Sequence, residues 1–194
     1  GDDTSGILSY KQCKQRVLVL AELFRKIPER HVAILLPSSI GSTLVILALM
    51  FAKKVPVPLN WTLGPRYLEQ MMAISGAKRA ISSWRFMEKL NFVDFGSVAD
   101  QIELLEDLGK EIRIKEKLKG FLSSFFSPPH LDEQSTAVIL FTSGSESNPK
   151  GVPLSHKNIL ATIRNCYHNL EGVYVPNDVM YGILPQFHSF GFSN

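Results

Sequence analysis

The chain has few cysteines, no long apolar run and no marked excess of charge of either sign. Its only cysteines among 194 residues are Cys13 and Cys166, which show no metal-binding spacing and are typical of reduced intracellular thiols, although a bridge between them stays open. The 21 basic and 18 acidic side chains leave a net charge of +3 and are scattered along the chain. This pattern argues against a nucleic-acid partner.

Membrane-spanning and targeting signals are also missing. The most apolar segment, residues 44–52, is far shorter than the roughly 20 residues that cross a bilayer. The acidic start, Gly1-Asp2-Asp3, does not resemble a signal peptide. We therefore expect a cytoplasmic protein, and leave open a position of the full-length protein at the inner face of the membrane. Neither a Walker pattern nor a glycine-rich dinucleotide fingerprint is present.

Helical and strand periodicities alternate through the first 82 residues, beginning with a capping-box pattern at Ser9 and Gln12. Helices are predicted over residues 9–27, 38–52 and 64–76, and buried strands over residues 31–36, 55–59 and 79–82. This alternation predicts an α/β fold, with a mostly parallel sheet and right-handed crossover helices.

The most informative segment is Leu-Phe-Thr-Ser-Gly-Ser-Glu-Ser-Asn-Pro-Lys-Gly-Val, residues 140–152. It places four hydroxyls, two glycines and a lysine between a predicted buried strand, residues 137–141, and a second apolar run. The N–H and O–H donors of such a connection can converge on an anion, and Lys150 adds a cation where the chain enters the next strand. An ordinary turn built from the same residue types is the alternative. The order of the residues favours a polyphosphate site.

Thr142-Ser143-Gly144-Ser145 followed by Pro149-Lys150-Gly151-Val152 resembles the phosphate-binding signature of the adenylate-forming (AMP-binding) superfamily. That superfamily includes acyl-CoA synthetases, acyl-acyl-carrier-protein synthetases, luciferases and peptide-synthetase adenylation domains. Similar landmarks lie in the family's order at residues 31–37, 55–60, 75–78, 155–158 and 184–191, so the resemblance covers nearly the whole chain.

Glu146-Ser147 departs from the Thr-Gly that the superfamily normally has at these two positions. The glutamate variant resembles the branch of fatty acyl-acyl-carrier-protein synthetases, some of them fused to a lysophospholipid acyltransferase, as in bifunctional enzymes of the 2-acylglycerophosphoethanolamine acyltransferase type. A serine in place of glycine costs roughly 1 kcal/mol if the backbone there is left-handed. We expect the Glu146 carboxylate to point away from the phosphates, because it would repel them.

The resemblance implies a two-step ligase that uses ATP and Mg²⁺. A carboxylate attacks the α-phosphorus of ATP and releases pyrophosphate, and a thiol then takes the acyl group from the acyl-adenylate. The implied partners are a fatty acid or related carboxylic acid and acyl carrier protein or CoA, with peripheral membrane association of the full-length enzyme left open. The alternatives are an enzyme that adenylates another carboxylic acid and a non-catalytic ATP-binding module.

The resemblance also assigns site residues. Lys150 and His188 are the expected catalytic residues, and no metal-ligating residue is expected. The expected cofactor-binding residues are Thr142, Ser143, Gly144, Ser145, Lys150 and Gly151. Hydroxyls and Lys150 would stabilise the leaving pyrophosphate, and the two glycines would let the backbone approach it.

Two histidines receive different expected roles. His188 follows a predicted apolar strand, residues 180–184, and lies between Phe187 and Phe190. The resemblance places it near the carboxylate that is adenylated, whereas a packed histidine satisfied by a backbone carbonyl is the alternative. His156 is expected to support the phosphate-binding loop.

The segment from residue 84 to residue 126 is harder to interpret. A basic run at residues 110–119 precedes an apolar stretch, which fits either an amphipathic surface for acyl carrier protein or anionic lipid, or a solvated helix packed on the core. We favour the packed helix.

Two regions are expected: residues 1–133 as an N-terminal α/β subdomain, and residues 134–194 as the start of a second subdomain with the phosphate-binding loop. The family's adenine-binding segment, ribose-binding aspartate and C-terminal domain with its catalytic lysine are not found in this sequence. The chain therefore resembles an N-terminal portion of the large domain, and we expect no acyl-adenylate formation by this chain alone.

Overall fold

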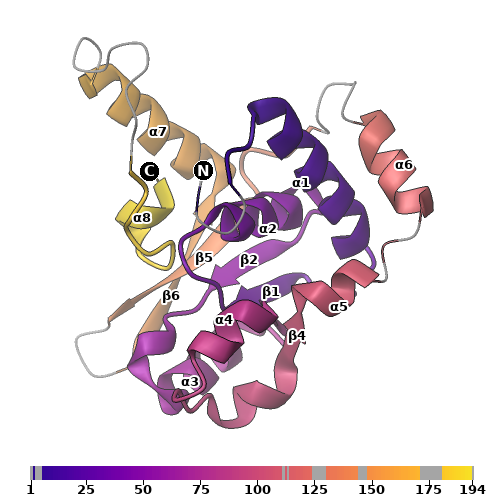
Figure 1. The fold of residues 1–194 in the computed structure, drawn as a ribbon. Coiled ribbons are helices and arrows are strands. Elements are labelled where there is room, and N and C mark those ends of the chain that lie inside the picture. Colours follow the sequence, from indigo (N-terminus) through magenta and orange to yellow (C-terminus); the bar gives the residue numbers. More distant parts are fainter. Residues whose placement is uncertain are drawn as a thin grey trace.

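The computed structural model describes residues 2, 6–110, 112, 114–123, 130–143, 148–170 and 181–193 (Figure 1). Four parallel strands form its main sheet in the order β2-β1-β3-β4. Their bounds are His31–Ile34 for β1, Val55–Pro58 for β2, Ala80–Ser82 for β3 and Ile102–Leu104 for β4. The predicted α/β fold with a parallel sheet is confirmed.

Helices cover both faces of this sheet, which explains why its strands are apolar on both sides. In β1, Val32 and Ile34 face the core shared with α1 (Tyr10–Phe24) and α2 (Ile40–Phe51). Ala33, between them, faces a second core beneath α3 (Pro65–Ser75). Successive side chains of a strand point to opposite faces, so a strand buried on both faces is uniformly apolar. The result is a layered α/β/α arrangement.

Local signals fix the helix ends. The N–H of Gln12 donates to Ser9 Oγ, and the N–H of Ser9 donates to Gln12 Oε1 at 2.8 Å, so the predicted capping box begins α1. Ser39 caps α2 in the same way through the N–H of Ser42. Gly76 ends α3 in a left-handed conformation with φ of 69°, which glycine adopts without steric cost. The structure ends α1 at Phe24, earlier than the sequence predicts.

The segment after β3 folds into short elements. They are α4 (Trp84–Lys89), the 3₁₀ helix η2 (Gly96–Gln101), α5 (Leu105–Lys110) and α6 (Ile114–Ser123); a further 3₁₀ helix, η1 (Trp61–Leu63), follows β2. Helix α6 packs along the outer side of α1 (Figure 1), where a Cβ on Gly120 would lie 2.6 Å from Val19 Cα. Lys119 of α6 pairs with Glu22 at 2.6 Å. The favoured packed helix thus contacts α1, although Leu118 and Leu122 stay more than half exposed.

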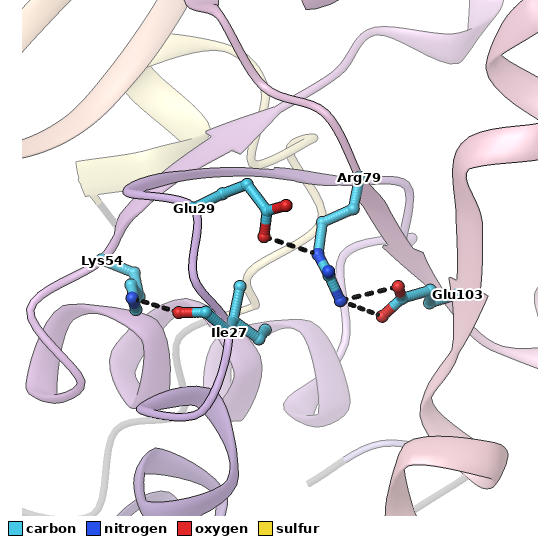
Figure 2. A network of polar contacts seen from close by, with 5 residues as sticks. All are labelled: Ile27, Glu29, Lys54, Arg79 and Glu103. Carbon is cyan, nitrogen blue, oxygen red and sulfur yellow. Dashed lines mark hydrogen bonds and ion pairs between the residues drawn. The ribbon is translucent and has the colours of Figure 1, made fainter.

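Polar contacts join the strands at their amino-terminal edge, as Figure 2 shows. Arg79 donates from Nε to Glu29 Oε2 at 3.0 Å and from Nη1 to both carboxylate oxygens of Glu103. These bonds link the residues that precede β1 and β3 to β4. Lys54, just before β2, donates to the carbonyl of Ile27. The opposite, carboxyl-terminal edge of the sheet is the edge where α/β proteins bind ligands.

A two-stranded antiparallel hairpin follows, formed by β5 (Thr136–Ser143) and β6 (Pro149–Ser155). Helix α7 (His156–Leu170) leaves the end of β6 and extends away from the body, and α8 (Ser189–Ser193) lies beneath it (Figure 1). The strand predicted at residues 180–184 is not formed at residues 181–184, where Tyr181 and Ile183 are 81% and 80% exposed. An apolar stretch becomes a strand only with a neighbouring strand to bond, and none lies beside it in the described part of the chain.

Cys13 and Cys166 are both free thiols. Among the described residues, no helix is long and apolar enough to cross a membrane.

Candidate functional site

The hairpin brings two of the predicted site residues together. Thr142 on β5 and Lys150 on β6 are directly opposite in the antiparallel register, one pair before the end of the ladder at Ser143 and Pro149. Opposite residues of such a ladder project from the same face, with Cβ atoms about 5 Å apart. Both are exposed, so a hydroxyl and an ammonium group are accessible side by side where the hairpin leads into residues 144–147.

A cavity of about 390 Å³ adjoins Thr142 and extends to residues 187–189, the segment that contains His188. Thr142 and His188 both line the cavity. Its remaining walls come from the end of β2, from η1 and α3, from the hairpin and from the neighbours of His188: Pro58, Asn60, Leu63, Tyr67, Met71, Leu140, Phe141, Pro149, Phe187 and Ser189. No sequence motif indicates that η1 and α3 line this cavity. Their side chains reach it only because the folded chain brings the hairpin next to them.

His188 is exposed, and its ring lies 4.8 Å from that of Phe187 at a tilt of 57°. Its backbone N–H donates to the carbonyl of Pro185 at 3.0 Å, which closes a turn. His188 and Thr142 thus line one cavity, and the expected place of His188 near the adenylated carboxylate stays a prediction.

Gly151 has a different environment from the one expected for a phosphate contact. It pairs with Phe141, on the face of the hairpin opposite to Thr142 and Lys150. A Cβ there would lie 3.3 Å from Phe141 Cε1 and 3.4 Å from side-chain atoms of Ile139 and Ile74. The absence of a side chain at position 151 thus serves close packing of the hairpin on α3.

The remaining loop residues are only partly described. Gly144, Ser145, Glu146 and Ser147 lie outside the described residues, so their expected roles stay predictions. Ser143 pairs with Pro149 at the end of β5, but its side chain lies outside what the structure describes. No group of three or more His, Cys, Asp or Glu side chains suited to a metal ion occurs in the described ranges.

His156 is not placed to support the loop. It begins α7 next to Ser155, which pairs with Thr136 at the far end of the hairpin. Ser155 lies six residue steps along β6 from Pro149, a distance of about 20 Å at ~3.3 Å per residue. Its N–H donates to the carbonyl of Ser135 at 3.2 Å, so His156 joins α7 to the start of β5.

The partly buried imidazole of His156 makes stability depend on pH. Burial lowers the pKa of His156 below its usual 6.5, and Asp132 offsets part of that effect. The unfolded chain therefore binds more protons than the folded chain below about pH 6.5, and this destabilises the fold as the pH falls through that range. We expect His156→Gln to make the decrease in unfolding free energy between pH 7.5 and pH 5 shallower, as measured by urea titration.

The matched control for this prediction is His168→Gln, at an exposed position on the same helix. The slope should change less in this control than in His156→Gln. Equal slopes for wild type and His156→Gln would show that burial of His156 does not contribute.

Residues 2–194 match the family model for AMP-binding enzymes, a range that includes both the parallel sheet and the hairpin. The chain belongs to this adenylate-forming family. Membership agrees with the α/β architecture and its parallel four-stranded sheet.

Individual relatives show how the family's members differ. The chain is 30% identical over 166 residues to a ferrichrome siderophore peptide synthetase of Mycosarcoma maydis, covering 84% of this chain and 4% of the relative. It is 26% identical over 207 residues to the medium-chain-fatty-acid–[acyl-carrier-protein] ligase JamA of Moorena producens, covering 98% of this chain and 32% of that protein. This chain thus spans less than a third of the length of either relative.

The fold agrees with a solved structure of the protein VinN in complex with 3-methylaspartate. The two superpose with a TM-score of 0.78 at 18% identity, covering 98% of this chain and 51% of VinN. This likeness establishes the fold.

Proposed function

We propose that this chain provides the pyrophosphate side of a site that activates a fatty acid with ATP and passes the acyl group to a thiol of acyl carrier protein or CoA. The observation that carries the proposal is the cavity shared by Thr142 and His188, with Lys150 opposite Thr142 on the same face. In this proposal residues 134–194 begin a second subdomain, and residues 1–133 form the first.

The residues present fit a polyphosphate. The exposed Lys150 ammonium and Thr142 hydroxyl can both donate to phosphate oxygens, and charge-assisted bonds of this kind are the stronger class. Mg²⁺ prefers phosphate oxygens and water to a dedicated set of protein ligands, which is compatible with finding no group of three His, Cys, Asp or Glu side chains suited to a metal ion in the described part of the chain. When bound, the ion would neutralise charge on the triphosphate.

Each residue then has a distinct task in the first step. An oxygen of the substrate carboxylate bonds to the α-phosphorus as the bond to the pyrophosphate oxygen breaks, and that oxygen keeps the electron pair. Lys150 and Thr142 stabilise the growing negative charge on the pyrophosphate. His188, across the cavity, orients the carboxylate. The acyl carbon is attacked by the thiol in the second step, and AMP leaves.

A fatty acid is favoured as the substrate because the Glu146 variant resembles the acyl-carrier-protein synthetase branch. The relative JamA, by its name, acts on medium-chain fatty acids and acyl carrier protein, and it covers nearly the whole of this chain. The peptide synthetase relative supports the alternative of an amino acid substrate.

ATP–pyrophosphate exchange tests the proposal, using a protein in which this chain is extended to the length of its family relatives. Exchange should depend on a medium- or long-chain fatty acid and should remain at background with amino acids or aryl acids. Saturable ATP binding without exchange for any acid would favour the non-catalytic module instead. The chain of 194 residues, tested alone, should bind ATP without supporting exchange; clear turnover would contradict its assignment as half of a site.

A further inference from the structure

The start of α2 and the residues just before it contact residues 184–186, which lie more than 140 positions later in the sequence. Ser38 Oγ donates to the carbonyl of Leu184 at 2.8 Å. Ser42 Oγ donates to Gln186 Oε1, and Gln186 Nε2 donates to Thr43 Oγ1 at 2.9 Å. Three hydroxyls from one helix end thus bind two residues of the segment that leads into His188.

The direction of these bonds fixes the amide of Gln186 in one orientation. The Thr43 hydroxyl donates its hydrogen to the carbonyl of Ser39 at 3.1 Å, so towards Gln186 it can only accept. Gln186 must therefore present its NH₂ group to Thr43 and its carbonyl oxygen to Ser42. A rotated amide would lose the bond to Thr43, and the buried Ser42, only 2% exposed, would have to accept from the NH₂ group instead of donating to the carbonyl oxygen.

The bound segment is also compact in itself. His188 N–H donates to the Pro185 carbonyl at 3.0 Å, and Phe192 N–H donates to the His188 carbonyl at 2.9 Å. A Cβ on Gly191 would lie 2.3 Å from the carbonyl oxygen of Pro185. We therefore expect a displacement of Gln186 to move His188 as well, because hydrogen bonds and close packing restrain the turn between them.

This turn forms a wall between two cavities. Gln186 and Thr43 border an apolar cavity of about 470 Å³ between α2 and α7. The adjacent Phe187 and His188 border the 390 Å³ cavity that also contains Thr142. The position of Gln186 therefore decides where the imidazole lies relative to Thr142.

We propose that Ser42 and Thr43 are positioning residues that hold the Gln186–His188 turn, and so place the His188 imidazole opposite Thr142. The catalytic meaning of this placement rests on the proposed function, whereas the placement itself does not. The hydroxyls act through Gln186 and need no contact with substrate.

Amide hydrogen exchange on this chain tests the placement without any ligand. Thr43→Val keeps the shape of the side chain but removes its hydroxyl, so exchange at the His188 and Phe192 amides should become about tenfold faster, the effect of losing roughly one hydrogen bond. The His188 imidazole resonance should shift as well. Thr43→Ser, which keeps the hydroxyl, should restore wild-type exchange and the wild-type resonance. Amides of the β5–β6 ladder should keep wild-type protection in both variants.

Thr162→Val on α7 is the matched control, because the Thr162 hydroxyl likewise donates to a carbonyl four residues earlier, that of Asn158 in the same helix. It should not change exchange at His188. Unchanged His188 and Phe192 amides in Thr43→Val, or an equal change in Thr162→Val, would overturn the inference. If Thr43→Val fails to fold, Gln186→Leu removes the same bonds from the other side and must give the same local increase.

The extended enzyme separates this inference from the proposed function. Thr43→Val should raise the KM for the carboxylic acid while the KM for ATP stays near wild type, and Thr43→Ser should recover it. A wild-type enzyme without acid-dependent exchange would contradict the proposed function, and the amide exchange result would still decide the placement. A rise in both KM values together would contradict a specific effect on His188.

Discussion

Lys150→Ala should weaken binding of ATP and of inorganic pyrophosphate to this chain by about 30-fold, the loss expected for one charge-assisted contact worth roughly 2 kcal/mol. The ammonium group lies opposite Thr142 at the end of the hairpin and is exposed to a ligand at this end. Isothermal titration calorimetry at constant ionic strength measures the effect. In the extended enzyme the same change should lower the rate of ATP–pyrophosphate exchange, since the charge on the leaving pyrophosphate grows in the transition state.

Lys157→Ala is the appropriate control for Lys150→Ala. It removes the same charge from an exposed lysine in the first turn of α7, at the far end of the hairpin. Long-range attraction between the protein and the triphosphate would be weakened equally by both changes, and only a local contact distinguishes them. Equal losses of affinity would therefore contradict a direct role for Lys150.

Phe24→Ala should have the largest effect on stability, lowering the unfolding free energy by about 3–5 kcal/mol. The Phe24 ring is 0% exposed and packs at the end of α1 in the core between α1, α2 and the sheet. Its removal loses buried apolar area and leaves a cavity. Because a domain of ordinary stability has only about 5–15 kcal/mol in total, a large share of the molecules should unfold on mild heating. Urea denaturation followed by circular dichroism measures the difference.

Phe92→Ala is the matched control for the core substitution, because Phe92 is 79% exposed. The same number of atoms is deleted from a side chain that is mostly in contact with water. Its unfolding free energy should remain within about 0.5 kcal/mol of wild type. A loss as large as that of Phe24→Ala would show that the effect arises in the unfolded state.

The fold could be predicted where local pattern and burial agree. β1 is buried on both faces and follows a capped helix, so its position and type can be predicted from the sequence, whereas its neighbours in the sheet cannot. β4 was missed because it has three half-buried residues and little apolar signal, and its edge position is joined to β3 partly by Arg79 and Glu103. The end of α1 was placed too late, since the apolar period continues to Ile27 beyond the last helical residue.

The candidate site could be predicted only as far as its residues lie in one contiguous motif. The sequence predicts a short polar connection between two apolar runs, whereas the direct pairing of Thr142 with Lys150 comes from the antiparallel register. The packing role of Gly151 depends on Ile74 of α3, and the bond that Gln186 donates to Thr43 joins positions 143 residues apart. The periodicity of apolar residues predicts helices and strands but not contacts between distant segments, because those contacts form only when the chain folds.

The long separation between Thr43 and Gln186 also sets the order of events while the chain is being synthesised. All four strands of the parallel sheet lie within residues 31–104, so that layer can form while residues 105–194 are still unmade. At the roughly 5–20 residues per second of translation, Gln186 is added about 4–16 s after Leu104. During that interval the hydroxyls of Ser38, Ser42 and Thr43 lack their partners Leu184 and Gln186. The turn at residues 186–188 can therefore dock onto this layer only after the residues of its four strands have been made.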